Sequence, residues 1–483
     1  MYLDSLLQQM NYKVINGDVH ILITNLVYDS RKITKDSVFV CITGAISDGH
    51  DYIKSAIKAG ALAVIVEKDI KIDSSITIIK VNNTRKALAL MSVEYFGHPA
   101  EKLITIGITG TKGKTTTAYM IREALEKIGK KTGLIGTIET LIGEQTVPAT
   151  NTTPESYVIQ ETFAKMVDAG CEYLVMEVSS QGLMLNRVEG IIFDYAIFTN
   201  LSPDHIGEHE HKDFEDYMNC KSKLFKQCKL GLVNIDDKNV DKIIQDSRCK
   251  VVGYGFSKTA DFKADNIELF KREGVLGIKY NLTGLMECNV EVDIPGKFSV
   301  YNSLSAIALL YYLKIDKLNI LEILNQVKVK GRVELIPISD KFTLIIDYAH
   351  NAMSLESLLS TLKKYKPKRL VCLFGCGGNR SKDRRYEMGE VSSRLADLTI
   401  VTSDNPRFEE PQDIIDDIIV GIKRANGNYI EIIDRKEAIS YCISKAKDGD
   451  LIVLAGKGHE DYQEIKGVKY PMDERLIIKD IMA

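Results

Sequence analysis

The sequence predicts an α/β protein built on parallel sheets, and three observations support this fold class. From about residue 104, apolar strand-like runs alternate with glycine-rich or polar turns and helix-like segments, as in strand-helix-strand units. Similar runs recur late in the chain and, in shorter form, before residue 100. The length of 483 residues suits about three domains of roughly 150 residues each.

The central segment contains the clearest passage from strand to helix. LITIGITG (103 to 110) reads as a strand, and the helix-like KTTTAYMIREALEKIG (114 to 129) follows it. Two further strands, YLVMEVSS (173 to 180) and YAIFTNLSPDH (195 to 205), also end in polar residues. Open α/β sheets bind ligands at the carboxyl ends of their strands, so this edge is the candidate site.

The last part of the chain repeats the pattern and predicts a second nucleotide-type fold. Its strand-like runs are FTLIIDYAH (342 to 350), RLVCLFGCGGNR (369 to 380), LTIVTSDNPR (398 to 407) and DLIVLAGKGHE (450 to 460). A smaller α/β domain is expected first, from VFVCITG (38 to 44) and GALAVIVE (60 to 67). We place the boundaries near residues 99 and 329.

Composition and charge exclude several classes of protein. Lys+Arg 63 against Asp+Glu 66 gives a net charge of −3, so no global charge attracts nucleic acid. The N-terminus lacks a basic region, Asp4 interrupts its apolar stretch, and no apolar run approaches the ~20 residues of a membrane span. Nine cysteines without a CxxC pair argue against a disulfide framework or a structural zinc site. We expect a cytoplasmic protein.

GITGTKGKTTT (107 to 117) has the context of a phosphate-binding loop, between a strand and a helix. The full motif G-x-x-x-x-G-K-[ST] is not met, because Ile108 stands at its first glycine. In the shorter loop, Lys114 is expected to contact nucleotide phosphates and Thr115 to help hold Mg²⁺. Glu177, at a strand end, is either a carboxylate near that Mg²⁺ or an acid in water.

SPDHIGEHEH (202 to 211) contains His205, His209 and His211. The H-x-x-x-H spacing suits a zinc pair on a helix, but Pro203 and Gly207 disfavour a regular helix. A zinc hydrolase is therefore the minor alternative, and one histidine ligating Mg²⁺ is preferred.

Two other segments are ambiguous from the residues alone. Either Lys221 or Lys223 in DYMNCKSKLF (216 to 225) suits a phosphate. TSDNPRFEEP (402 to 411) predicts a turn, in which Arg407 is either solvated or the reader of an anionic substrate.

The order of nine short motifs resembles the Mur ligases over essentially the whole chain. The motifs are GTKGKTT, TNTTP (150 to 154), EVSSQGL (177 to 183), NLSPDH (200 to 205), GRVE (331 to 334), DYAHN (347 to 351), FGCGGNRSKDRR (374 to 385), DNPR (404 to 407) and GKGHE (456 to 460). DSR (29 to 31) and DGHDYI (48 to 53) add to the resemblance, in the segment where that family holds UDP.

The resemblance implies three domains and a ligation reaction. Residues 1–99 would bind UDP, 100–329 would form a P-loop-type ATPase domain, and 330–483 a Rossmann-like domain that binds the amino acid. ATP would phosphorylate the D-Glu γ-carboxylate of UDP-N-acetylmuramoyl-L-Ala-D-Glu during cytoplasmic peptidoglycan precursor synthesis. An amine would then displace phosphate. A monomer acting on small molecules, without nucleic acid or membrane, is expected.

The resemblance also implies roles for individual residues. ATP would contact Gly110, Thr111, Lys112, Gly113, Lys114, Thr115, Thr116, Asn302, Arg332, Asp347 and His350. Two Mg²⁺ ions would be held by Thr115, Glu177, His205 and Lys221, the last carbamylated by CO₂. Lys114, Lys221, His205 and Glu177 would be catalytic. The muramoyl dipeptide would contact Ser30, Asn151, Thr152, Thr153, Ser179, Gln181 and Arg187. The amino acid would contact Arg380, Asp404, Asn405, Pro406, Arg407, Gly456 and Glu460.

DNPR is typical of family members that add meso-diaminopimelate, whose distal carboxylate pairs with the arginine. L-lysine, LL-diaminopimelate and lanthionine are the alternative amines. Folylpolyglutamate synthase is a rival enzyme with the same short loop but no UDP domain or DNPR. An ATP-dependent binding protein without ligase activity is a third hypothesis, for which TNTTP and DNPR have no explanation.

Overall fold

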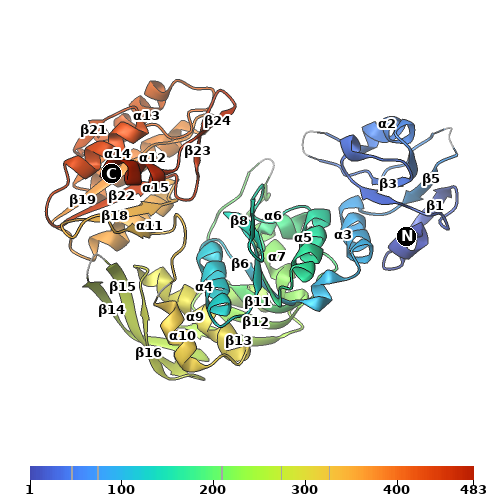
Figure 1. Cartoon of the computed structure of the whole chain (residues 1–483), viewed down its shortest axis with the longest axis horizontal. Helices are drawn as coiled ribbons and strands as arrows, with labels where there is room; N and C mark the ends of the chain where they lie inside the picture. The colour runs from blue at the N-terminus through green and yellow to red at the C-terminus, as the bar shows by residue number, and fades with distance from the viewer. Residues whose placement is uncertain (45–46, 73–74, 208–209, 273–274, 326) are drawn as a thin grey trace. The chain divides into compact units, whose positions relative to one another are not determined.

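The structure is a computed structural model that describes residues 1–44, 47–72, 75–207, 210–272, 275–325 and 327–483. The chain divides into two units, Met1–Asp261 and Phe262–Ala483, which are described separately. Figure 1 shows mixed helices and strands in both, which confirms the α/β class. Within the described ranges, none of the helices has the length and apolarity needed to cross a membrane.

The first unit begins with a five-stranded sheet of order β1-β5-β4-β3-β2. Its strands are β1 (Lys13–Asn16), β2 (Asn25–Val27), β3 (Ser37–Val40), β4 (Ala61–Val66) and β5 (Thr77–Lys80). All neighbours pair in parallel except β1, which runs antiparallel to β5. One face packs on α3 (Thr84–Tyr95), whose Leu88 and Met91 are fully buried. These strands and α3 form a small α/β arrangement, and its extent as a separate domain stays a prediction.

The central sheet of the first unit places three strand ends side by side. Parallel strands run in the order β13-β12-β11-β6-β10-β7. Their bounds are β6 (Ile104–Thr109), β7 (Thr132–Ile135), β10 (Tyr173–Glu177), β11 (Phe193–Phe198), β12 (Cys228–Asn234) and β13 (Lys250–Gly255). Because β6 lies between β10 and β11, the loop after β6 has a neighbouring strand end on each side.

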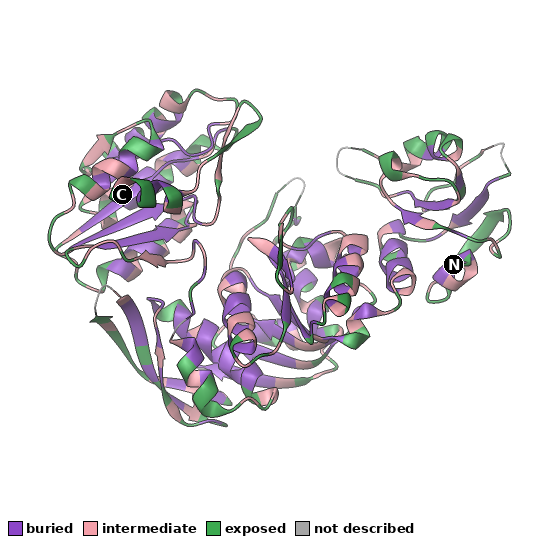
Figure 2. Cartoon of the chain, in the orientation of Figure 1, coloured by how far each residue is buried: buried purple, intermediate pink, exposed green. Residues whose placement is uncertain are grey.

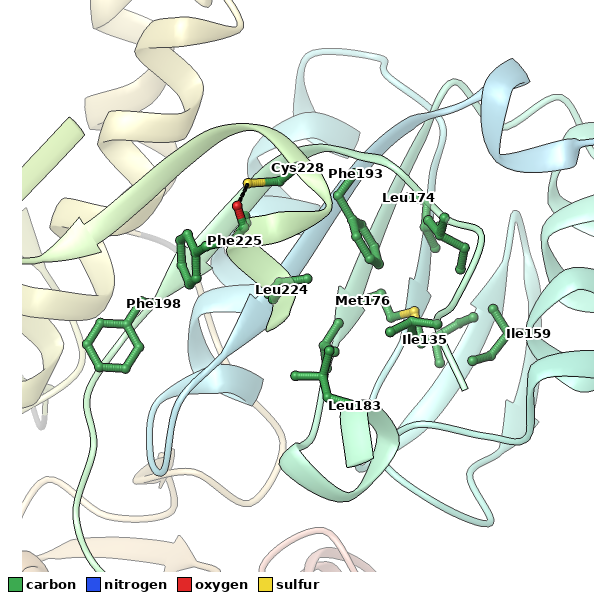
Figure 3. Close-up of a cluster of buried hydrophobic side chains, with 14 of the residues drawn as sticks. Ile135, Ile159, Leu174, Met176, Leu183, Phe193, Phe198, Leu224, Phe225 and Cys228 are labelled. Atoms are coloured by element: carbon green, nitrogen blue, oxygen red, sulfur yellow. Dashed lines mark hydrogen bonds between the residues drawn. The ribbon is translucent and has the colours of Figure 1, made fainter. Parts of the chain in front are cut away.

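Apolar side chains fix the helices on this sheet. Leu174 and Met176 of β10 share one buried cluster with Ile159 of α5 (Ser156–Asp168) and Phe225 of α7 (Phe214–Lys226). Figure 3 shows part of that cluster, where Met176 lies beside Ile135, its partner on β7. Leu224 and Phe225 of α7 are fully buried in this cluster, so they hold in place the helix that carries Lys221.

The second unit opens with antiparallel strands that the sequence did not reveal. β14 (Phe262–Arg272), β15 (Val275–Gly284) and β16 (Cys288–Val292) pair in succession. The helix α9 (Lys297–Tyr312) packs on them, and Tyr280 donates or accepts a 2.8 Å hydrogen bond with Ser303. Residues 262–292 therefore add antiparallel strands to an otherwise parallel-rich α/β fold.

The second unit also contains a six-stranded sheet covered on both faces. Its order is β17-β18-β22-β19-β20-β21, parallel except for β17. The bounds are β17 (Glu334–Ile336), β18 (Thr343–Asp347), β19 (Arg369–Phe374), β20 (Leu398–Val401), β21 (Tyr429–Glu431) and β22 (Asp450–Ala455). Figure 2 shows its central strands coloured as buried.

Alternating side chains of β19 explain the two covered faces. Leu370, Cys372 and Phe374 pack in the cluster that contains residues of α11 (Ala352–Lys363), α12 (Lys382–Leu395) and α13 (Pro411–Arg424). Val371 and Leu373 point into the opposite cluster, with residues of α14 (Arg435–Ser444) and α15 (Glu474–Met482). Such a doubly covered parallel sheet matches the nucleotide-type fold predicted for this region.

The three-domain boundaries near residues 99 and 329 stay a prediction. All nine cysteines have free thiols, and most of them are buried.

Candidate functional site

The phosphate loop lies between β6 and α4 (Lys114–Lys127), as predicted. Gly110 and Gly113 have φ of +145° and +90°, which L side chains rarely adopt. A Cβ at Gly110 would lie 2.0 Å from Thr199 Oγ1, so this position also excludes a side chain by space. Gly113 directly precedes α4, whose N-terminal amides form the anion-binding end of a helix.

The strand end of β11 anchors this loop. Asn200 accepts from the Lys112 amide at 3.0 Å and donates to the Lys112 carbonyl at 2.8 Å. The Thr111 amide donates to the Asn200 carbonyl at 2.9 Å. The Thr111 and Tyr217 hydroxyls share a 3.0 Å hydrogen bond. The loop conformation is therefore fixed by neighbours, which suits a preorganised phosphate site.

Glu177 lies on the other side of the loop and is almost fully buried, with 1% exposure. Its Oε2 accepts from Thr115 Oγ1 at 3.0 Å and from Thr137 Oγ1 at 3.1 Å, and its Oε1 accepts from the Thr137 amide at 2.9 Å. Glu177 is therefore not a solvated strand-end acid, and its place near a Mg²⁺ ion stays a prediction. Hydroxyl and carboxylate oxygens are the ligands that Mg²⁺ prefers, so this donor set fits that ion.

Two lysines converge on the same carbonyl. Lys114 Nζ donates to the Gly110 and Thr111 carbonyls at 2.9 and 3.1 Å. Lys221 Nζ, on α7, donates to the Gly110 carbonyl at 2.9 Å and lies 4.6 Å from the Tyr217 ring centroid. Lys221 is 1% exposed. Burial, with a smaller contribution from Lys114, holds the pKa of Lys221 well below its ordinary value.

The ambiguity between the two α7 lysines is resolved by this geometry. Lys223 Nζ reaches the Leu183 carbonyl at 3.5 Å instead of the phosphate loop. Lys221 is therefore the α7 lysine at the site.

Within the described residues, His205 and His211 each bond an acidic residue other than Glu177. His205 is exposed, has φ of +55° and pairs through Nδ1 with Glu210 Oε1 at 3.1 Å. His211 is buried and pairs with Asp216 at 2.9 Å. His209 lies outside the described residues, and residues 202–207 form no helix. A zinc pair on a helix thus has no support from the described part of the loop.

Residues predicted to bind the muramoyl dipeptide divide into two groups. Thr152, Thr153, Ser179 and Arg187 gather near Glu177: Thr153 Oγ1 donates to the Glu177 carbonyl at 2.9 Å, and Arg187 Nη1 donates to the Thr153 carbonyl at 2.8 Å. Thr152 shares a 3.0 Å hydrogen bond with Thr137, and Ser179 caps α6 (Ser180–Met184). Asn151 and Gln181 are exposed, and Ser30 begins a short 3₁₀ helix in the N-terminal part.

Four predicted ATP residues belong to the second unit. Asn302 is buried on α9. Asp347 accepts from the Val333 and Ala349 amides, each at 2.8 Å, so it holds the backbone at the end of β18. The Arg332 guanidinium lies 4.9 Å from the Tyr348 ring centroid, and His350 is exposed beside the same ring. Their role in binding ATP stays a prediction.

DNPR (404 to 407) follows β20, and GKGHE (456 to 460) follows β22. Together these residues are called the acceptor loop. Asp404 and Asn405 are buried. Asn405 Nδ2 donates to Glu460 Oε2 at 3.0 Å, and its Oδ1 accepts from Lys457 Nζ at 2.6 Å and from the Glu464 amide at 2.8 Å. A Cβ at Gly456 would lie 2.9 Å from Asp404 Oδ2. DNPR and GKGHE, distant in sequence, are therefore one cluster.

The Arg407 side chain is held by hydrogen bonds, and its backbone adopts an unusual conformation. Its φ is +54°, Nη1 donates to the Gly378 carbonyl at 2.9 Å, and Nε donates to Glu464 at 3.3 Å. Within the described ranges, Nη2 makes no hydrogen bond. Arg407 is thus held by two hydrogen bonds, and its role in reading an anionic substrate stays a prediction. Arg380 is exposed.

Comparison with known proteins covers nearly the whole chain. Residues 22–97 match the description "Mur ligase family, catalytic domain", residues 108–310 "Mur ligase middle domain" and residues 331–458 "Mur ligase, glutamate ligase domain". A relative from Clostridium perfringens, named UDP-N-acetylmuramoyl-L-alanyl-D-glutamate--2,6-diaminopimelate ligase, is 46% identical over 100% of this chain and 99% of its own length. The chain belongs to the Mur ligase family.

Further similarities agree with this Mur ligase assignment. A Clostridioides difficile protein of the same name is 42% identical, with 100% of both chains covered. A solved structure of that name has a TM-score of 0.73 at 28% identity and covers 100% of this chain and 98% of its own. A Mycobacterium tuberculosis folylpolyglutamate synthase shares the fold, with a TM-score of 0.60 at 17% identity, 77% of this chain and 92% of its own.

Sequence reasoning missed several residues that shape this Mur ligase site. Thr137 gave no signal, because it is an isolated threonine before β8 (Glu139–Ile142). Lys457 lies inside GKGHE, and its place between two glycines after a strand could have marked it. Arg385, also inside a quoted motif, is buried and bonds Asp417 and Glu409 at 2.9 and 2.8 Å.

Proposed function

We propose that this Mur ligase adds 2,6-diaminopimelate, with the meso isomer as the first candidate, to UDP-N-acetylmuramoyl-L-Ala-D-Glu at the expense of ATP. The reaction would occur in the cytoplasm during peptidoglycan precursor synthesis, with the chain acting as a monomer. The observation that carries the substrate proposal is the joint placement of Arg407, Asn405 and Glu460 at one cluster of strand ends.

The phosphate-binding half accounts for the first step. A γ-carboxylate oxygen of D-Glu attacks the γ-phosphorus of ATP, the bond to the β,γ-bridging oxygen breaks, and acyl phosphate and ADP form. The Lys114 ammonium lies beside a loop of oriented backbone amides. Both stabilise the negative charge on the phosphoryl group during its transfer. Thr111 and Lys112 are held by Asn200, so the cradle needs little reorganisation.

Thr115 and Glu177 would hold Mg²⁺, with His205 and carbamylated Lys221 as further predicted ligands. Bound there, the ion would neutralise part of the phosphate charge. The buried position of Lys221 supports carbamylation, because a lysine amine that is desolvated is more often neutral and can attack CO₂. The product is a carbamate anion, and one proton leaves the nitrogen.

The acceptor half accounts for the second step. Glu460 and Asp404 supply carboxylates for an ammonium group, and the Arg407 guanidinium supplies donors for a carboxylate. The neutral reacting amine adds to the acyl carbon, and phosphate then leaves as the amide forms. The distal carboxylate is absent from lysine, so Arg407 gives a physical reason to place a diamino diacid first.

The experiment is ADP release by the full chain with UDP-N-acetylmuramoyl-L-Ala-D-Glu and Mg²⁺. We expect release to require an amine and to be fastest with meso-diaminopimelate among the meso and LL isomers, lanthionine and L-lysine. ADP release that ignores the amine contradicts ligation. Activity with a folate and glutamate instead would favour the folylpolyglutamate synthase hypothesis. The solved structure of such an enzyme shares only the fold with this chain.

A further inference from the structure

Lys457 is a lysine whose side chain has no exposure to solvent. It follows β22, between Gly456 and Gly458, whose φ values are +107° and +53°. With glycine in this left-handed conformation on each side, the Lys457 side chain points toward Asn405 and away from solvent. A buried ammonium is costly unless its charge and its three protons are all satisfied.

The surroundings of Lys457 satisfy that requirement. Its Nζ donates to Asn405 Oδ1 and the Tyr462 carbonyl, each at 2.6 Å, and to Glu460 Oε2 at 3.2 Å. Asp404 Oδ1 lies 3.7 Å from the same nitrogen. An ammonium has three donors, so these contacts use all of them and leave none for a substrate.

These contacts fix the orientation of the Asn405 amide. Lys457 and the Glu464 amide both donate to Oδ1, which forces Nδ2 toward Glu460. A flipped amide would present NH₂ to two donors and an oxygen to a carboxylate. One lysine therefore sets the hydrogen-bonding pattern of both DNPR and GKGHE.

Lys457 also sets the charge of the cluster. Asp404 and Glu460 are two partly or fully buried carboxylates, and Lys457 balances one of them. Glu464, the other carboxylate residue beside Asn405, pairs with Arg407 at 3.3 Å. One negative charge therefore remains and matches one ammonium group of an incoming diamino acid. Without Lys457, two like charges would share a poorly solvated site, and Glu460 would lose the geometry that receives the amine.

We infer that Lys457 is a positioning residue for the amine substrate, holding Asn405 and Glu460 in the geometry that binds the ammonium group without touching the substrate itself. The inference deepens the proposed function and rests on it.

The test compares steady-state kinetics of the full chain and its Lys457→Met and Lys457→Arg variants. We expect Lys457→Met to raise the KM for diaminopimelate by about 10-fold or more, the effect of ~1.4 kcal/mol, with the KM values for ATP and the UDP-linked dipeptide unchanged. Lys457→Arg keeps the charge but has a planar donor fork, so we expect partial restoration. In a crystal structure of Lys457→Met, the Asn405–Glu460 hydrogen bond should be lost.

Lys469→Met is the matched control. Lys469 Nζ lies 4.0 Å from the Tyr462 ring centroid, the same ring that Lys457 approaches at 5.4 Å, but Lys469 is exposed. We expect wild-type kinetics from this variant.

Two results would overturn the inference. One is an unchanged KM for diaminopimelate in Lys457→Met. The other is an equal rise of all three KM values with no restoration by arginine, which indicates a structural role alone. Should Lys457→Met not fold, the same KM comparison in Lys457→Arg decides. Wild-type protein that releases no amine-dependent ADP contradicts the proposed function instead, so the two failures are distinguishable.

Discussion

At the scale of single residues, Lys221 is the side chain whose chemistry depends most on burial. Desolvation lowers its pKa, so its neutral amine becomes abundant at a lower pH than that of an exposed lysine. Carbamate formation, which needs the neutral amine, should therefore grow as pH rises. We predict that removing CO₂ lowers activity and that bicarbonate restores it, with more restoration at higher pH. Mass spectrometry of the native protein and turnover under degassed buffer measure this.

Two variants sharpen the Lys221 prediction. Lys221→Ala should be inactive and regain part of its turnover with acetate, which supplies the missing carboxylate. Lys223→Ala, on the same helix but directed at the Leu183 carbonyl, should retain activity and the CO₂ response. Equal losses in the two variants, or full activity without CO₂, would contradict a special role for Lys221.

Arg407 determines substrate preference by its donor geometry. We predict that Arg407→Ala lowers the preference for diaminopimelate over lysine by about 10- to 100-fold, because a hydrogen bond to a charged group contributes about 1.5–3 kcal/mol. The ratio of kcat/KM values for the two amines measures it. Arg407→Lys keeps charge without the fork and should fall between. A ratio unchanged in Arg407→Ala would show that Arg407 does not read the distal carboxylate.

At the scale of elements, the turn between β6 and α4 leaves no room for an added side chain. We predict that Gly110→Ala abolishes measurable ADP binding in titration calorimetry, because its Cβ would lie 2.0 Å from Thr199 Oγ1 and push the loop from its anchors. Gly129→Ala is the control: its φ is +78°, but nothing lies within 4 Å of the added atom. ADP affinity should survive there, although alanine at a positive φ lowers stability. Equal binding by both variants would refute the constrained-turn account.

The same elements show what sequence alone predicts. The strands ending at Thr109, Glu177 and Val401 were predictable, because buried parallel strands are apolar runs that stop at polar residues. The long β14–β15 hairpin was not, since its exposed positions break up the apolar pattern. Thr137 could not be found because its function comes from a long-range hydrogen bond to Glu177. The position of Lys457 in GKGHE could have marked it as a residue of interest, but its full burial, which decides its role, appears only in the structure.

At the scale of the whole molecule, each unit has its own apolar clusters. In the second unit, one fully buried ion pair lies among the strand ends that carry the acceptor loop. Arg435 Nε donates to Glu474 Oε1 at 2.9 Å, and its Nη2 donates to the Ala455 carbonyl at 2.9 Å. Arg435 therefore connects α14 and α15 to the end of β22, next to Gly456.

We predict that Glu474→Gln lowers stability by about 3–5 kcal/mol, because it leaves a buried guanidinium without its counter-charge. Replacing both partners in Arg435→Met/Glu474→Met should recover much of that loss, since no uncompensated charge remains. Segment-resolved hydrogen exchange is the measurement. We expect Glu474→Gln to reduce amide protection in β18, β19 and β22 while β6 and β10 of the first unit keep theirs, since the pair lies within the second unit. Equal loss of protection in both sets of strands would mean that the two cores do not open independently, and unchanged protection would mean that the pair contributes little to the stability of its sheet.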